Sequence, residues 1–299
     1  MDYYKSWYAI AHINEVKNKP VRVERFGKNL VAWKSDLDII VMENRCPHRG
    51  AELSSGKICD NAIRCPFHGF EFDTSGQCRF TPETQSAIPN LKAKTYPTKV
   101  IADMLWVNIF DEDLDNEYAF NFIENIHNEF EGKYSKLTDT WDNNIRHCIE
   151  NQLDYTHLAT VHKKSIGRGY KIPQNIELKV TDNYLAAYKD DKLMLKYILP
   201  NMWMLNNAGS LKIIVYFVPV NENQTKLYLI NYRKFLTSKI VKSIAVLVFG
   251  ITNKIILNED KRVVKTQKFD EDYNTKDFLL RHDQIIKEFR KIWGNKKDT

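Results

Sequence analysis

Short apolar runs separated by turn residues dominate the first third of the chain. They are rich in Val, Ile, Phe and Trp, and four of them stand out, at residues 21–26, 30–35, 38–43 and 104–110. Turn-forming residues such as Gly27–Lys28–Asn29 and Ser75–Gly76 interrupt the runs. Runs of this length between turn signals predict a small antiparallel β domain. We place that domain at residues 1–115 and expect the acidic stretch at 111–117 to link it to a second one.

The second domain, at residues 116–299, mixes helical and strand patterns. Strand-like runs are found at 176–188, 192–199, 211–220 and 225–235, with a hairpin turn at 221–224. Helices are expected over about 145–162, near 240–267, and in a last amphipathic segment with Phe278, Ile285, Phe289 and Ile292 on one face. The expected fold class is therefore α+β, with the strand-only part first.

Composition excludes several classes of protein. The 299 residues are 43% hydrophobic and 12% aromatic, which rules out a mainly disordered chain. The net charge of +6 is spread along the chain, so nucleic acid is not an expected partner. Lys242 and Lys254 interrupt the longest apolar stretch, so we expect no transmembrane segment, and the first residues show no export signal. Five cysteines, an odd number, favour thiols or metal ligands in a reducing cytoplasm.

Two short loops contain the strongest candidate chemistry. CPHRG and CPFHG give Cys46-x-His48 and then Cys65-x-x-His68. Thiolates and imidazoles in glycine-closed loops suit a bound metal, and a tetrahedral structural zinc is one interpretation. The other is a Rieske [2Fe-2S] cluster, in which two cysteines hold one iron and two histidines hold the other. The second interpretation is favoured because each loop supplies one ligand of each kind.

The residues around these loops show a family resemblance. CPHRGAELSSGKI and IRCPFHGFEFDTSGQC resemble the Rieske domain of Rieske non-haem iron oxygenases. The resemblance extends from Trp7–Tyr8 to the last helix, and the length and domain order are similar to the homotrimeric type, such as vanillate O-demethylase and dicamba monooxygenase. It implies an N-terminal antiparallel-β Rieske domain followed by a C-terminal α+β catalytic domain with a mononuclear iron site.

A second group of polar residues lies on the helix expected at 145–162. At about 100° per residue, Asn151, Asp154, His157 and His162 fall on one side of it together with apolar residues. Burying these groups is costly unless something pairs with them. The histidines are about 140° apart on a straight helix, so holding one ion between them requires a π-like bulge or a helix end between the two. Two satisfied core histidines are the alternative interpretation.

The spacing Asn-x-x-Asp-x-x-His-x₄-His resembles the mononuclear iron motif of the same oxygenases. By that resemblance His157 and His162 are iron ligands. Asp154 is then the residue that links a Rieske histidine of one subunit to an iron-ligand histidine of the next. Asn151 joins Asp154 as a candidate catalytic residue.

A facial triad also needs a carboxylate beside its two histidines. The family takes it from a late helix, and the matching segment is ILNEDKRVVKTQ at 256–267. Asp260 falls within the apolar stripe defined by Ile256 and Val263, whereas Glu259 lies towards its edge. Since a lone carboxylate inside a buried stripe requires a cation, we choose Asp260 as the third ligand. Glu259 is expected to support the site or to face solvent.

The resemblance implies a terminal oxygenase. Electrons would come ultimately from NAD(P)H through a separate reductase, with or without a ferredoxin. The Rieske cluster and a mononuclear Fe(II) would use them with O₂ to hydroxylate or oxidatively demethylate a small organic substrate, aromatic or polycyclic. Aromatic-ring cis-dihydroxylation is the alternative reaction, and a Rieske electron-transfer protein without oxygenase activity is the alternative from another class. The expected assembly is a homotrimer in the cytoplasm.

Overall fold

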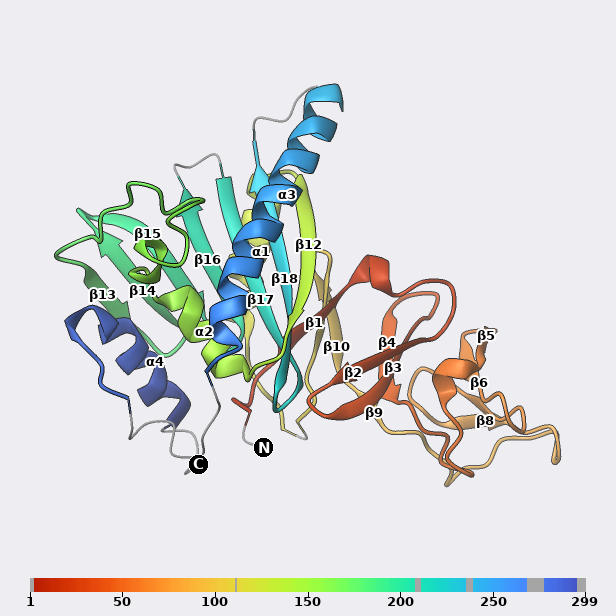
Figure 1. Cartoon of the computed structure of the whole chain (residues 1–299). Helices are drawn as coiled ribbons and strands as arrows, with labels where there is room; N and C mark the ends of the chain where they lie inside the picture. The colour runs from red at the N-terminus through yellow and green to blue at the C-terminus, as the bar shows by residue number, and fades with distance from the viewer. Residues whose placement is uncertain (1–2, 111, 208–210, 235–238, 268–276, 295–299) are drawn as a thin grey trace. The chain divides into compact units, whose positions relative to one another are not determined.

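The chain divides into two compact units in the computed structural model, which describes residues 3–110, 112–207, 211–234, 239–267 and 277–294 and leaves aside the side chains of 207 and 239–249. One unit is Lys5–Asn116; the other is Glu117–Thr299 together with the N-terminal residues up to Tyr4 (Figure 1). Strands make up the regular structure of the first unit apart from two 3₁₀ turns, and the second combines a large sheet with helices. The predicted α+β class is therefore confirmed.

Three small antiparallel sheets build the first unit. They are β1 (Tyr8–His12), β11 (Met104–Val107) and β10 (Thr98–Ile101); β2 (Val21–Arg25), β3 (Lys28–Lys34), β4 (Ile39–Glu43) and β9 (Thr95–Tyr96); and β5 (Lys57–Cys59), β6 (Ala62–Arg64), β7 (Glu71–Phe72) and β8 (Cys78–Phe80). The four predicted apolar runs correspond to β2, β3, β4 and β11. Trp33, Met42 and Phe72 form one buried core with Cys46 and Cys65, so both cysteine loops are anchored in a hydrophobic core of this unit.

A seven-stranded antiparallel sheet forms the centre of the second unit. Its strands, in spatial order, are β12 (Tyr134–Trp141), β18 (Gln224–Arg233), β17 (Leu211–Asn221), β16 (Met202–Asn207), β15 (Lys192–Ile198), β14 (Tyr184–Lys189) and β13 (Glu177–Val180). The single strand predicted at 176–188 is wrong, because Thr181 Oγ1 accepts hydrogen bonds from the backbone N–H groups of Asn183 and Tyr184 and turns the chain there. The sequence pattern also missed β12 and β16.

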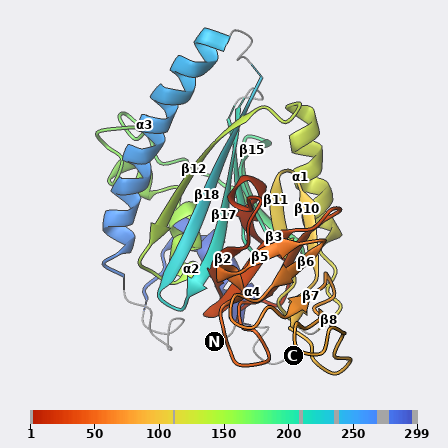
Figure 2. The same cartoon turned by 90° about the vertical axis from the view of Figure 1, so that its right-hand side faces the viewer.

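Among the described residues, four α-helices cover the two faces of this sheet: α1 (Glu117–Glu129), α2 (Ile145–Leu153), α3 (Lys239–Val264) and α4 (Gln284–Gly294). Figure 2 shows α1 and α3 on opposite sides of it. The side-chain contacts agree with this arrangement. On one face of the sheet, Lys212 of β17 forms an ion pair with Glu129 of α1. On the other face Lys261 of α3 pairs with Asp139 at 3.1 Å, and Trp293 of α4 donates to Tyr197 Oη at 3.3 Å. The sequence pattern missed α1, which begins where the linker was predicted to end.

Two helix predictions need correction. The last helix begins at Gln284, and Phe278 is 90% exposed, whereas Ile285 and Phe289 are buried as predicted. On α3 the buried stripe passes through Leu257, Asp260 and Val264, whereas Val263, which was predicted to belong to the stripe, is 37% exposed. Among the described residues, no helix combines the length and the apolar character that a membrane span requires.

Candidate metal centres

The two cysteine loops of the first unit have the same backbone design. Gly50 N–H donates to Cys46 O at 2.8 Å, and Gly69 N–H donates to Cys65 O at 3.2 Å. Both glycines have a left-handed backbone, with φ of 79° and 74°, which residues with a Cβ adopt at a cost. Each loop therefore turns tightly after its cysteine.

The four predicted cluster ligands come together in pairs. The thiols of Cys46 and Cys65 are close enough to influence each other's ionisation, and the rings of His48 and His68 lie 4.8 Å apart between centroids. Both cysteines are 2% exposed, whereas His48 is exposed and stacks on Phe70 at 4.5 Å. Two buried sulfurs beside two more exposed imidazoles are the donor set that a Rieske cluster needs, with sulfur on one iron and nitrogen on the other.

Burial dominates the acid–base chemistry of the first cysteine. It raises the pKa of the Cys46 thiol to about 11, although the backbone N–H groups of His48 and Arg49 point at the sulfur and lower it in part. A cluster held by Cys46 and Cys65 would displace their thiol protons. The same N–H groups would then stabilise negative charge on the sulfur ligands.

In the second unit, α2 ends at Leu153 because the Asp154 side chain bonds to the backbone that follows. Its Oδ1 accepts from Thr156 N at 2.7 Å and from Thr156 Oγ1 at 2.6 Å, and His157 N–H lies 3.4 Å away. Such a side-chain turn replaces the helical hydrogen bonds. The helix predicted over 145–162 is therefore wrong after Leu153. Its end precedes both histidines instead of falling between them, and His157–Ala159 form a 3₁₀ turn.

Two histidines and an aspartate converge beyond this turn. The Nε2 atoms of His157 and His162 lie 3.3 Å and 2.9 Å from Asp260 Oδ1, and all three candidate ligand atoms are within 4.8 Å of one another. Asp260 is 2% exposed. Asp260 Oδ1 is buried and has no hydrogen-bond partner among the described residues. The residues chosen from the sequence as a triad are thus brought together.

The partners of the other ring nitrogens show why a cation fits. His162 Nδ1 lies 2.7 Å from Glu259 Oε2, and His157 Nδ1 faces the backbone oxygen of Asp154. Since carboxylate and carbonyl oxygens only accept hydrogen bonds, we infer that each Nδ1 bears the proton of the neutral ring and each Nε2 a lone pair. Two ring lone pairs and the carboxylate of Asp260 then meet, which is unfavourable unless a cation lies between them. The donor set fits a metal ion with facial 2-His-1-carboxylate ligation.

Charges around the three atoms favour an ionised carboxylate. Burial raises the pKa of Asp260, but the two neighbouring histidines, His157 and His162, outweigh it and lower that pKa to about 2. Burial lowers the pKa of His162, yet Asp260 and Glu259 raise it above its usual value. A metal ion therefore meets a negative Asp260 at neutral pH and competes with a proton only at histidine.

Supporting residues surround the three atoms, and the sequence identified some of them. Glu259, expected to support the site or face solvent, accepts from His162 and from Ser165 Oγ at 2.6 Å. Gln152, which sequence reasoning missed, lies with Nε2 3.4 Å from Asp260 Oδ2. Asn151 is near in sequence, but its Nδ2 is buried without a hydrogen-bond partner among the described residues.

Sequence similarity decides the nature of the first unit, because residues 6–97 match the family model of the Rieske [2Fe-2S] domain. The first unit contains a Rieske domain. This match settles the choice between zinc and a Rieske cluster in favour of the cluster.

Curated relatives of this Rieske protein are oxygenases and demethylases. It is 31% identical over 199 residues to aminopyrrolnitrin oxygenase PrnD of Pseudomonas fluorescens, covering 60% of this chain and 49% of the relative. It is 28% identical over 172 residues to methylxanthine N3-demethylase NdmB of Pseudomonas putida, covering 52% and 47%. The chain thus spans about half the length of the curated relatives it matches. The relationship to Rieske oxygenase alpha subunits, expected from the motifs, is confirmed.

Solved structures show that the likeness of fold extends over both units. NdmA of Pseudomonas putida CBB5 matches with a TM-score of 0.80 at 21% identity, covering 98% of this chain and 92% of that one. Dicamba monooxygenase bound to dicamba matches with a TM-score of 0.79 at 18% identity, covering 99% and 98%. At these identities the comparison concerns the fold alone.

The helix that leads to Asp154 in the Rieske protein is fixed by a buried ion pair. Arg290 of α4 donates from Nε and Nη2 to the two carboxylate oxygens of Glu150 on α2, at 2.6 Å and 2.9 Å. Both side chains are less than 10% exposed. Arg146, one turn earlier on α2, lies over the Trp293 ring with its guanidinium carbon 5.5 Å from the centroid. α4 thereby holds α2 in place through two contacts.

We expect Arg290→Met to lower the free energy of unfolding by about 3–5 kcal/mol, since it leaves the Glu150 carboxylate buried without its bidentate partner. Chemical denaturation followed by tryptophan fluorescence measures the change. Lys291→Met is the matched control: Lys291 is exposed, pairs only with Glu288 among the described residues, and should change the value by less than about 1 kcal/mol. Equal effects of the two substitutions would contradict the role given to this pair.

Proposed function

We propose that this chain is the terminal oxygenase component of a Rieske oxygenase system, acting on a small organic substrate by hydroxylation or oxidative demethylation. The observation that supports this most is the convergence of His157 Nε2, His162 Nε2 and Asp260 Oδ1 in a chain that also has a Rieske domain. An electron carrier needs only the first centre. A chain that keeps a second, buried ligand set has a use for it.

We assign each centre its own residues. Cys46 and Cys65 would hold one iron of the [2Fe-2S] cluster, and His48 and His68 the other. His157, His162 and Asp260 would hold a mononuclear Fe(II). When bound, the cluster supplies single electrons and the mononuclear iron supplies a place for O₂ beside the substrate.

Asp154 is the proposed link between the two centres, in an assembly of several copies. Its Oδ1 is occupied by Thr156 and the His157 backbone, whereas Oδ2 accepts no hydrogen bond from the described residues and lies 3.8 Å from His157 Nδ1. The side chain is 27% exposed, so Oδ2 can accept a hydrogen bond from outside this chain. In a homotrimer, that donor would be His48 or His68 of a neighbouring copy, and electrons would cross this bond. Asn151 stays a candidate catalytic residue on the strength of the motif alone.

The electron supply lies on other proteins. We infer a reductase, alone or with a ferredoxin, that draws electrons from NAD(P)H. We propose that this chain is located in the cytoplasm. Its five cysteines are free thiols in the structure, as a reducing compartment would keep them.

The sheet suggests a substrate with polar groups. Trp203 pairs with Tyr197 across β15 and β16, so both point to the sheet face that α4 covers. Trp203 is paired through Val215 of β17 with Leu229 of β18, so these three side chains share one face. Asn231 is two residues after Leu229 on β18 and therefore lies on the same face. Trp203 Nε1 and Asn231 Oδ1 are buried and lack hydrogen-bond partners among the described residues. We propose that a flat, apolar substrate with one acceptor and one donor satisfies both.

The reaction type is tested with ¹⁸O₂. The reconstituted protein, an electron-donor pair and a panel of O-methyl, N-methyl and unsubstituted aromatic rings are incubated, and products are identified by mass spectrometry. We expect single-oxygen incorporation, or loss of methyl from a methylated ring. Products with two labelled hydroxyls would instead establish the dihydroxylating alternative. That alternative is the second candidate because one relative, 26% identical, is a 3-chlorobenzoate-3,4-dioxygenase oxygenase subunit. Reduction of the cluster without any oxygenated product from the panel would contradict both.

A further inference from the structure

A cavity of about 470 Å³ lies beside the three-atom centre and outside it. Two segments line it: Thr160, Val161, Lys163 and Lys164 from the loop after His157, and Ile255, Asn258, Glu259 and Arg262 from α3. None of the three proposed iron ligands is among the lining residues. Glu259 separates the two places, because its Oε2 is bonded to His162 and Ser165. The cavity is therefore a second site that the oxygenase proposal does not use.

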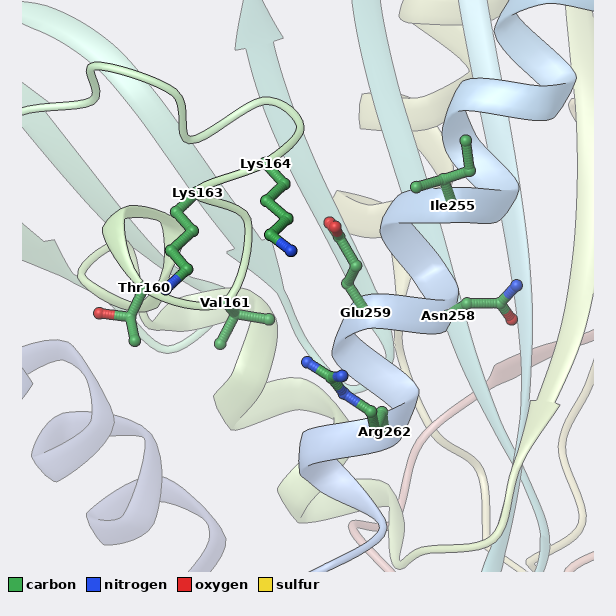
Figure 3. Close-up of a pocket in the computed structure, with 8 residues that line it drawn as sticks. All are labelled: Thr160, Val161, Lys163, Lys164, Ile255, Asn258, Glu259 and Arg262. Carbon is green, nitrogen blue, oxygen red and sulfur yellow. The ribbon is translucent and has the colours of Figure 1, made fainter.

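The cavity is strongly cationic. Lys163, Lys164 and Arg262 line it, and they have no ion pair in the part of the chain that the structure describes. Glu259, the one acidic lining residue, is already engaged by His162 and Ser165. In Figure 3 the ends of Lys164 and Arg262 point into the space between the loop and α3. Three cations around a hollow, with one engaged carboxylate, leave an excess of positive charge that an anion would neutralise.

Apolar surface occurs on both walls of the same cavity. Val161 lies on the loop side and Ile255 on the helix side, and Ile255 is 49% exposed. An inorganic anion would contact the cations and leave this surface in water. A ligand with an apolar body and one charged end would cover it, and about 470 Å³ is within the range of small-molecule pockets, roughly 300–1,000 Å³.

We propose that this cavity binds a small organic carboxylate. Its carboxylate lies between Arg262 and the lysines of the loop, where the planar guanidinium can donate two parallel hydrogen bonds. Its apolar body lies between Val161 and Ile255. The ligand would thus connect the loop that follows the first proposed iron ligand to the helix that bears the third.

Calorimetric titration of the metal-loaded protein with benzoate, at constant ionic strength, tests the proposal. We expect saturable binding with one site per chain, weakened about tenfold by Arg262→Gln and by Lys164→Gln. Benzamide, which has the same shape without the charge, and inorganic phosphate, which has charge without the apolar body, should each bind more weakly than benzoate. Lys254→Gln is the matched control, since Lys254 is exposed on the same helix and does not line the cavity.

Several results would overturn the proposal. They are the absence of saturable benzoate binding, unchanged affinity in both Arg262→Gln and Lys164→Gln, benzamide binding as tight as benzoate, and phosphate binding as tight as benzoate. Unchanged affinity in the two variants would place the benzoate elsewhere, for example at the iron centre. The titration uses neither substrate nor electron donor, so its failure leaves the proposed oxygenase function untouched.

Discussion

Asp260→Ala is expected to yield a protein that holds its Rieske cluster and has almost no mononuclear iron. The carboxylate supplies one of three protein ligands and the only negative charge among them, and at a pKa of about 2 it is ionised throughout the neutral range. Two neutral imidazoles alone bind Fe(II) weakly. Iron analysis should fall by about one atom per chain, while the visible absorption of the cluster is unchanged, because Cys46, His48, Cys65 and His68 belong to the other unit.

Glu259→Gln is the matched control for this experiment. Glu259 is the neighbouring acid on α3, and it touches His162 Nδ1 instead of contributing a ligand atom. A glutamine oxygen still accepts that hydrogen bond but without charge, so the affinity for iron should fall by about 10–100-fold and not disappear. The choice of third ligand would be wrong if the Asp260→Ala protein retained its full mononuclear iron. It would also be wrong if the Glu259→Gln protein lost more iron than the Asp260→Ala protein.

Asp154→Asn is expected to separate metal binding from turnover. Asparagine keeps the Oδ1 acceptor on which Thr156 and His157 depend, so the local turn should form and both metal centres should load. The amide nitrogen that replaces Oδ2 cannot accept a hydrogen bond from a neighbouring histidine. We expect product formation to fall by about 10–100-fold or more, as when other outer partners of metal ligands are lost.

Stopped-flow measurement locates the loss. In Asp154→Asn the donor protein should reduce the Rieske cluster at the usual rate, and the cluster should then reoxidise slowly in the presence of substrate and O₂. Asp182→Asn, an exposed acid in the turn between β13 and β14, controls for the change of charge. Reoxidation at the wild-type rate in Asp154→Asn would rule out the proposed link.

Local motifs pointed to the residues that the structure brings together at the two proposed metal centres. Cys46, His48, Cys65 and His68 lie in two five-residue loops, where spacing alone fixes which side chains can meet. The prediction that Asp260 lies among buried positions is confirmed, although the buried stripe passes through Leu257 and Val264 and not through Val263. Its role as a metal ligand stays a prediction. Chemistry constrained this choice more strongly than helix periodicity did.

Helix periodicity gave the wrong local structure between the two proposed histidine ligands. It assumed a helix through 162, whereas Asp154 ends the helix with its own side chain, a competition that a hydrophobic pattern does not reveal. The strand β12 was missed for a related reason. Its sequence YSKLTDTW is largely polar, and it becomes a strand through pairing with β18, which no local pattern can show.

The central claim is that one chain holds two separate iron centres, and metal analysis of the anaerobically reconstituted protein tests it most directly. The account predicts about three iron atoms and about two acid-labile sulfides per chain, with one iron removable by a mild Fe(II) chelator while the cluster spectrum persists. About two iron atoms per chain, none of them removed by the chelator without bleaching the cluster, would show a carrier without an oxygenase site and would contradict the account.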